Sequence, residues 1–320
     1  MTSDPSPAES HVPPEGNGGL PPSQSMAGKI FLGPNGIRAG WRILIAIAVF
    51  TMLQLGLSFA LIHIPAVRAW AHSRDKNVMT PGALLFGEGI TAFLAILTGL
   101  IMTAIEKRSF ADYGLPVDAA FGKRFCQGLP YGFAMLTLLM ALIAALHGFS
   151  LGGLALGGGE AVRYGLAYLL GFVLVAVFEE FSFRGYLQAT LTSGIGFWPA
   201  AVLLAIGFGA LHLGNPGEAK LGAVMAGAFG LLAAFSLLRT GSIWFAIGMH
   251  AAWDWGETYF YSVPDSGILA KGHVLDSSFH GPNWLTGGSV GPEGSVFVFA
   301  VLALAAMAIH YMFPAKQKTV

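Results

Sequence analysis

The sequence predicts an all-α, polytopic transmembrane helix bundle of about eight spans, and three observations lead to that prediction. Hydrophobic residues make up 54% of the 320 residues, charged residues only 11%, and the mean hydropathy is +0.65. Apolar segments also recur along the chain at about 20 residues each, which is the length that a bilayer requires. This combination is typical of integral membrane proteins and lies far from the average of soluble domains.

The chain opens with a polar region and then becomes apolar. Residues 1–28 are rich in Pro, Ser, Gly and Glu and contain no apolar run, so we expect a disordered tail and not a signal peptide. The membrane domain is expected over residues 29–320. Its expected spans are Trp41–Ile64, Ala83–Ala104, Leu129–Leu146, Tyr164–Phe183, Phe197–Leu213, Leu221–Leu238, Ile243–Tyr261 and Val296–Met312.

Two connections between these spans stand out. Residues 108–127 mix aromatic with charged side chains and are too polar to span, which predicts an interfacial location. Residues 262–295 are rich in Gly and Pro and form the longest connection. With this arrangement, eleven of the 17 Lys and Arg residues lie on the side of the N-terminus. Cytoplasmic connections carry an excess of these residues, so we expect both termini in the cytoplasm. The membrane in which we expect the protein is a bacterial plasma membrane.

Charge and cysteine content exclude several classes of function. The formal net charge is zero, and the charged residues are too few to form the basic face of a nucleic-acid-binding protein. The single cysteine, Cys126, excludes an intrachain disulfide and a thiolate metal site. Most of the 44 glycines are expected at helix contacts, because small residues let helices in a membrane approach closely.

Two adjacent acids and an arginine interrupt the fourth apolar segment. Glu180 and Arg184 are four residues apart, the helical spacing at which an acid and a base meet, so they can form an ion pair. Glu179 is turned by about 100° on the helix and is free for other chemistry. The alternative is a purely structural ion pair with one additional acid near the headgroups.

Further ionisable residues follow in later spans. His212 lies near the end of the fifth, and His250 and Asp254 lie four residues apart in the seventh. Each feature alone fits a structural role: His212 as an interfacial histidine, and His250 and Asp254 as a buried pair that satisfy each other's hydrogen bonds. Together with Glu179 they contain the groups needed to activate water and stabilise an oxyanion. Glu88 in the second span is expected to hydrogen-bond within the bundle, with a place in the cavity as the alternative.

In this order and spacing, the motifs resemble those of the CPBP (Abi) family. They are Glu179-Glu180-x-x-x-Arg184, Phe208-x-x-x-His212 and His250-x-x-x-Asp254, and the resemblance covers about residues 163–262. That family comprises type II CAAX prenyl endopeptidases and bacterial bacteriocin-processing or self-immunity proteins. The resemblance implies about eight transmembrane helices and a site in a membrane cavity that opens to the cytosol.

The resemblance also implies roles in peptide-bond hydrolysis inside the membrane. Glu179 matches the acid taken as the general base, and His212 matches the histidine that helps to hold the attacking water. His250 and Asp254 match the pair taken to stabilise the tetrahedral oxyanion. The matched positions that support the site are Glu180 and Arg184.

Asp254 departs from the pattern of the prenyl-endopeptidase members, which have Asn at this position. An ionised Asp can only accept a hydrogen bond, so Asp254 would be kept protonated, orient His250 or bind a metal. A catalytic zinc held by His212, His250 and Asp254 is therefore one alternative. We favour the reaction without a metal cofactor, because Glu179 has to be free as the base.

The expected topology sets a condition on the site. With cytoplasmic termini, the fourth span carries Glu179 towards the inner face, whereas a full fifth crossing carries His212 towards the outer face. They can meet only if the fourth helix continues past Arg184 to about Thr192 and the fifth is short or tilted. We expect that arrangement.

The expected partners are membrane lipid and a peptide or lipidated-protein substrate; the oligomeric state is left open. A second hypothesis is a non-catalytic bacteriocin-immunity or transporter-like membrane protein. In that case the acids and histidines would form a proton or ion relay.

Overall fold

A computed structural model describes residues 30–33, 36–75, 78–215 and 220–314, so the expected disordered tail lies outside the described residues. The chain divides into two units, Met1–Arg38 and Ala39–Val320. In the first unit, β1 (Leu32–Gly33) pairs antiparallel with β2 (Gly36–Ile37). All features discussed below belong to the second unit.

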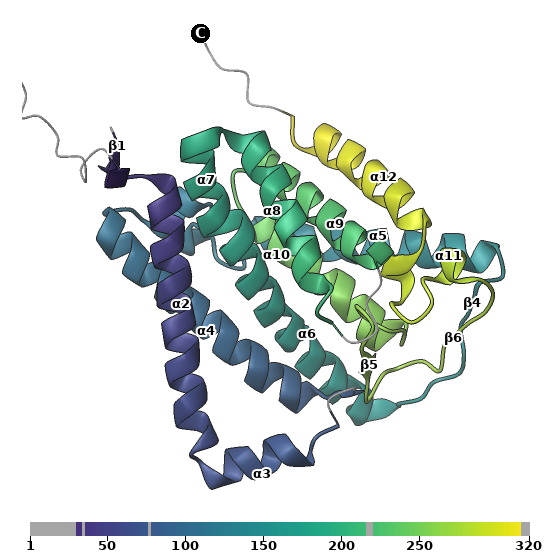
Figure 1. The fold of residues 1–320 in the computed structure, drawn as a ribbon. Helices are drawn as coiled ribbons and strands as arrows, with labels where there is room; N and C mark the ends of the chain where they lie inside the picture. Colours follow the sequence, from purple (N-terminus) through teal and green to yellow (C-terminus); the bar gives the residue numbers. More distant parts are fainter. Residues whose placement is uncertain (1–29, 34–35, 76–77, 216–219, 315–320) are drawn as a thin grey trace, which may run out of the picture. The chain divides into compact units, whose positions relative to one another are not determined.

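The second unit is a bundle of helices (Figure 1). Its longer elements pack side by side, and short helical turns connect them. The helices in chain order are α2 (Ala39–Ile62), α3 (Pro65–Ser73), α4 (Pro81–Glu106), η1 (Phe110–Tyr113), η2 (Val117–Ala119), α5 (Lys123–Ala145), α6 (Gly158–Glu180), η3 (Phe181–Leu187), α7 (Gln188–Ile195), α8 (Phe197–His212), α9 (Lys220–Thr240), α10 (Trp244–Trp255), η4 (Gly256–Phe260), α11 (Asn283–Thr286), η5 (Pro292–Gly294) and α12 (Phe297–Met312).

Every apolar segment expected to span coincides with a helix, which confirms the all-α prediction. Within the described ranges, five helices are long and apolar enough to cross a membrane: α2, α4, α5, the continuous α6–α7 and α9. Both α8 and α12 are apolar but have only 16 residues. α10 is shorter still, with 12 residues. Helix length alone therefore supports five crossings, and the remaining expected spans are short helices within the bundle.

The helix that carries the two acids is unusually long. α6, η3 and α7 form one continuous helix of 38 residues, Gly158–Ile195, so the expected continuation past Arg184 is confirmed. The following α8 is short, as the meeting of Glu179 and His212 requires. Directly after Glu180 the helix widens into the π-helical η3. Such segments occur frequently at functional sites, because they change the direction of side chains within a helix.

α10 lies in the interior of the bundle, where every residue from Trp244 to Asp254 is buried. Its backbone contacts that of α5 at two glycines. A Cβ atom at Gly132 would lie 1.9 Å from the carbonyl oxygen of Met249, and one at Gly128 would lie 2.2 Å from that of Phe245. These glycines allow the close approach expected from the composition. The helix that carries His250 and Asp254 is thereby held firmly in place.

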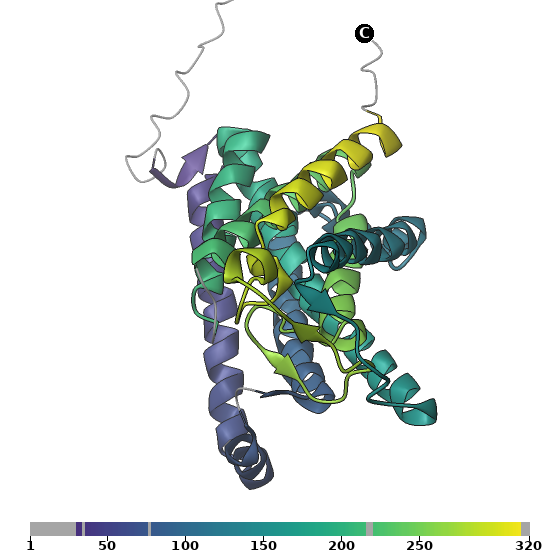
Figure 2. The ribbon, with the colours of Figure 1, turned by 90° about the vertical axis from the view of Figure 1, so that its right-hand side faces the viewer.

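The long connection 262–295 folds back onto the ends of the helices. Its strand β5 (Leu269–Ala270) pairs parallel with β3 (Val78–Met79), which precedes α4. Its strand β6 (Ser278–Phe279) pairs antiparallel with β4 (Phe149–Ser150), which precedes α6. Figure 2 shows these short strands beside the helices. The connection is thus a structured part of the molecule.

Candidate active site

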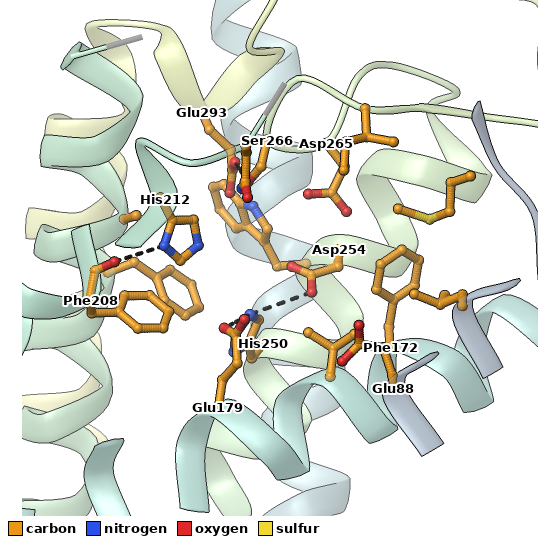
Figure 3. Close-up of a pocket in the computed structure, with 18 residues that line it drawn as sticks. Glu88, Phe172, Glu179, Phe208, His212, His250, Asp254, Asp265, Ser266 and Glu293 are labelled. Atoms are coloured by element: carbon orange, nitrogen blue, oxygen red, sulfur yellow. Dashed lines mark hydrogen bonds and ion pairs between the residues drawn. The ribbon is translucent and has the colours of Figure 1, made fainter. Parts of the chain in front are cut away.

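Glu179 and Glu180 occupy the last turn of α6 and differ in their surroundings. Glu180 is completely buried. Its Oε1 accepts hydrogen bonds from Arg184 Nη1 at 3.2 Å and from His250 Nδ1 at 2.9 Å. The predicted pair of Glu180 and Arg184 is therefore confirmed, and Glu180 also orients a histidine. Glu179 faces a cavity, with its side chain 22% exposed (Figure 3).

Arg184 connects three helices. Besides its bond to Glu180, its Nε donates to the carbonyl oxygen of Gly230 on α9 at 3.4 Å. Its guanidinium carbon lies 4.1 Å from the centre of the Phe208 ring on α8, a cation–π distance. A Cβ atom at position 230 would lie 2.3 Å from Arg184 Nη2, so Gly230 leaves the space that the guanidinium fills. Arg184 thus fixes the acid-bearing helix to the helix that carries His212.

The geometry of His212 gives a physical reason for the Phe208-x-x-x-His212 spacing. His212 Nδ1 lies 2.8 Å from the carbonyl oxygen of Phe208, one helical turn earlier. A carbonyl can only accept, so Nδ1 carries a proton, and in the neutral ring Nε2 is left as an acceptor. The two rings also pack, with centres 4.5 Å apart. Phe208 therefore contacts Arg184 and sets both the position and the tautomer of His212.

His250 lies between three carboxylates. Its Nδ1 donates to Glu180, while its Nε2 lies 3.4 Å from Asp254 Oδ2 and 3.7 Å from Glu179 Oε2. The expected proximity of His250 and Asp254 on one helical face is confirmed. Since Nδ1 is already a donor, Nε2 can donate only when the ring is an imidazolium. In that form His250 can offer a charged hydrogen bond to an anion in the cavity.

The four residues predicted to be catalytic line one cavity of about 200 Å³. They are Glu179, His212, His250 and Asp254. In Figure 3, Glu179 and His250 lie on one side of this space, His212 on another, and Asp254 beside His250. Glu180 and Arg184 are not among the lining residues and lie behind it. The structure thus gathers side chains from three separate helices around one space, while their chemical roles stay predictions.

A protein-family model matches this part of the chain. Residues 161–256 match the family described as type II CAAX prenyl endopeptidase, Rce1-like. These residues form an Rce1-like domain. The predicted resemblance to the CPBP family is confirmed over this segment, which contains all six predicted site residues. In a comparison with curated proteins, none matches the chain. The family and the apolar helices together indicate an integral membrane protein.

Three further acids, which lie outside the matched residues 161–256, line the same cavity: Glu88 on α4 and, from the long connection, Asp265 and Glu293. Thr91 Oγ1 donates to Glu88 Oε2 at 2.9 Å, so Glu88 fulfils both roles considered for it. Burial, reinforced by the neighbouring Glu293, raises the pKa of Asp265 to about 7. No regular spacing relates Asp265 and Glu293 to the motifs, which is why the sequence did not point to them.

The geometry does not match the zinc site considered as an alternative. Among the described residues, three ligand atoms within 4.8 Å of one another occur at Glu257, Asp265 and Glu293, and not at the two histidines with Asp254. His250 also directs Nδ1 at Glu180 and Nε2 at two carboxylates. The donor set of His212, His250 and Asp254 is therefore not preformed, and the mechanism below uses no metal step.

Part of the cavity wall comes from connections between the helices. Its lining includes Met79, Asn215 and Ser266, in the connections that follow α3, α8 and η4. The N-terminal end of α2 and the C-terminal end of α12 lie at the same end of the bundle, away from α3 (Figure 1). With cytoplasmic termini, the connection that follows α3 would lie towards the opposite face of the membrane. Cytoplasmic termini and a cavity open to the cytosol both stay predictions.

Proposed function

We propose that this protein is an intramembrane endopeptidase in which Glu179 activates a water molecule for attack on a peptide bond. The observation that carries the proposal is the convergence of Glu179, His212, His250 and Asp254 on one cavity. The match to type II CAAX prenyl endopeptidases supports peptide-bond hydrolysis. A non-catalytic protein has no need for a carboxylate without a hydrogen bond on Oε2 to share a cavity with two histidines.

Glu179 fits the role of the base. Among the described residues, its Oε2 has no hydrogen-bond partner, so the lone pairs are free to take a proton from water. His212, with Nδ1 committed to Phe208, offers Nε2 as an acceptor for the second hydrogen of that water. General-base catalysis of this kind contributes about 10²–10⁴-fold to the rate. Glu179 would then pass the proton to the leaving amine.

His250 and Asp254 fit the stabilisation of the tetrahedral oxyanion. As an imidazolium, His250 donates from Nε2, and a protonated Asp254 donates from its carboxyl group. Glu180 holds the opposite ring nitrogen, and Arg184 compensates the charge of Glu180. These two residues position the histidine and do not touch the reacting atoms.

We propose a membrane-embedded or lipidated peptide as the substrate, since the cavity lies among apolar helices.

The test compares cells that express the wild-type protein with cells that express Glu179→Gln, which keeps the size of the side chain. Quantitative mapping of newly formed peptide ends in membranes should reveal cleavages in the wild type that fall at least about 100-fold in the variant. Equal thermal stability of the purified proteins is the control for folding. Identical cleavage patterns in both strains would overturn the proposal and favour the non-catalytic hypothesis.

We further propose that the termini are cytoplasmic, as the Lys and Arg distribution predicts. Cys126, exposed at the start of α5, is the single cysteine of the chain. Asp276 is exposed in the connection 262–295. In intact cells, a membrane-impermeant maleimide should label a Cys126→Ser, Asp276→Cys variant and spare the wild type. Labelling of the wild type alone would show the opposite orientation and overturn this proposal.

A further inference from the structure

Beside the catalytic residues, three acids form a second cluster that the proposed hydrolysis does not use. Glu257 lies in η4, directly after the helix of His250 and Asp254. Asp265 and Glu293 come from the two ends of the long connection. One carboxylate oxygen from each of the three lies within 4.8 Å of the others. Three segments of the chain thus bring three carboxyl groups together.

Glu257 is the observation that points to a ligand. It is completely buried, and neither of its carboxylate oxygens has a hydrogen-bond partner among the described residues. The indole of Trp253, one turn earlier, lies close to Glu257, but its Nε1 makes no hydrogen bond of standard geometry. In the described part of the chain, no lysine or arginine forms an ion pair with any of the three acids. A buried carboxylate without a partner is costly, and a bound cation would remove that cost.

The other two acids are held in place and have room for a ligand. Thr258 Oγ1 donates to Asp265 Oδ2 at 2.9 Å, and Ser266 Oγ donates to Glu293 Oε2 at 2.7 Å. Each hydroxyl fixes one oxygen of its carboxylate and leaves the other oxygen available. Asp265 and Glu293 also line the cavity, so an ion can reach the cluster from there.

The backbone around the cluster is shaped for close approach. Gly291 has φ +101°, a value that favours glycine. A Cβ atom at this position would lie 1.9 Å from the carbonyl oxygen of Pro264 and 3.1 Å from Glu257 Oε1. Gly291 therefore lets both ends of the long connection meet at Glu257, and Pro264 brings a carbonyl oxygen near the cluster. The donors are all hard oxygen atoms.

We propose that Glu257, Asp265 and Glu293 bind a divalent cation, Ca²⁺ in particular. Two oxygens that bind one Ca²⁺ at about 2.3–2.6 Å lie no more than about 5.2 Å apart, and this cluster meets that limit. Ca²⁺ accepts carboxylate and carbonyl oxygens in flexible geometry, whereas Mg²⁺ demands a near-ideal octahedron. The ion fastens both ends of the connection to the end of the helix that carries His250 and Asp254. It thereby orders the wall of the cavity.

The test uses the full-length protein purified in detergent and freed of metal with a chelator. Tb³⁺ replaces Ca²⁺ at oxygen sites and emits when a nearby tryptophan is excited, and Trp253 lines the cavity beside the cluster. We expect Tb³⁺ emission that Ca²⁺ displaces. We also expect Ca²⁺ to raise the apparent Tm by roughly 5 °C at about 100 times its Kd.

Three variants locate the site. Glu257→Gln and Glu293→Gln should each weaken Ca²⁺ competition at least about tenfold, since even residues behind metal ligands contribute 10–100-fold. Asp276→Asn removes an exposed acid of the same connection and should change nothing. Glu293 is only partly buried, so we expect its variant to fold even if the variant of the fully buried Glu257 does not.

The proposal is overturned if no Ca²⁺-displaceable emission occurs, or if the Glu293 variant retains wild-type affinity. The proposal is also overturned if Glu257→Gln has a higher Tm than the wild type by the same amount with and without Ca²⁺. That result would identify the cluster as a group of protonated acids. None of these measurements depends on proteolysis, so the cation site and the proposed function can fail separately.

Discussion

Glu106 and Glu179 are both carboxylates set among apolar helices, but their surroundings differ. Glu106 at the end of α4 accepts from Arg42 and Tyr113 through Oε2 and from Tyr186 through Oε1. Its side chain is 5% exposed. Glu179 is 22% exposed, faces the cavity, and its Oε2 has no hydrogen-bond partner in the described part of the chain.

The difference separates a structural carboxylate from one that is available for chemistry. Both oxygens of Glu106 are occupied, so it joins α2, α4 and η3 and has no capacity left for a ligand. Glu179 retains its capacity because its neighbour Glu180 takes the structural bonds to Arg184 and His250. Burial of a charge therefore indicates function only where the partners are incomplete.

The largest expected effect on stability comes from the structural carboxylate. Glu106→Gln leaves Arg42 buried without its counter-charge and should lower the stability by about 3 kcal/mol. Thermal unfolding of the purified protein measures the loss. Glu160→Gln, which affects an exposed pair with Arg163, is the matched control and should be almost neutral. If Glu179→Gln destabilises as strongly as Glu106→Gln, the distinction between the two carboxylates is wrong.

A second experiment examines what Asp254 contributes to the cavity. If Asp254 acts as a hydrogen-bond donor, Asp254→Asn should retain activity within about tenfold, because an amide also donates. Asp254→Ala should lose about 10²-fold, the effect of removing one oxyanion donor. The rate of appearance of the new peptide ends measures both. An Asn variant as inactive as the Ala variant would instead assign Asp254 to orienting His250.

The smallest expected effect concerns an exposed carboxylate outside the bundle. Hydrogen bonds from the backbone N–H of Ser109 at 2.8 Å and from its hydroxyl at 3.0 Å lower the pKa of Asp112. Because the folded-state pKa is the lower one, the stabilisation is present above the unfolded pKa of about 3.9. It is lost as the pH falls through the folded value.

The corresponding measurement follows the apparent Tm of the wild type and of Asp112→Asn between pH 7 and pH 3. The two curves should differ slightly at neutral pH and converge in acid. A difference that does not shrink as the pH falls below about 4 would mean that the Asp112 charge is not its source.

Much of the fold followed from local patterns. The apolar segments became helices because their composition and length leave a membrane-embedded backbone few other ways to satisfy its hydrogen bonds. The spacing of four residues placed Glu180 with Arg184 and His250 with Asp254, since one helical turn is a local property. The need for Glu179 to reach His212 also predicted the long fourth helix and the short fifth.

Other features depend on contacts between distant parts of the chain. The pairing of Arg42 with Glu106 joins residues 64 positions apart, and no local spacing announces it. The direction in which the cavity opens depends on how the connections fold over the helix ends. Glu257 lies between these two cases, the locally predictable and the purely tertiary. It is part of an expected span, where an acid is a functional candidate by itself. Its partners could not be foreseen.

The sequence by itself determined the helical membrane class, the acid and histidine motifs, and the face of each helix on which they lie. Only the tertiary structure decided that Glu180 orients His250, that the long connection closes one side of the cavity, and that Glu257, Asp265 and Glu293 meet. The physical reason is that helix periodicity is fixed by bonds within one turn, whereas a site between helices depends on which backbones can touch. Here that depends on single glycines such as Gly132, Gly230 and Gly291.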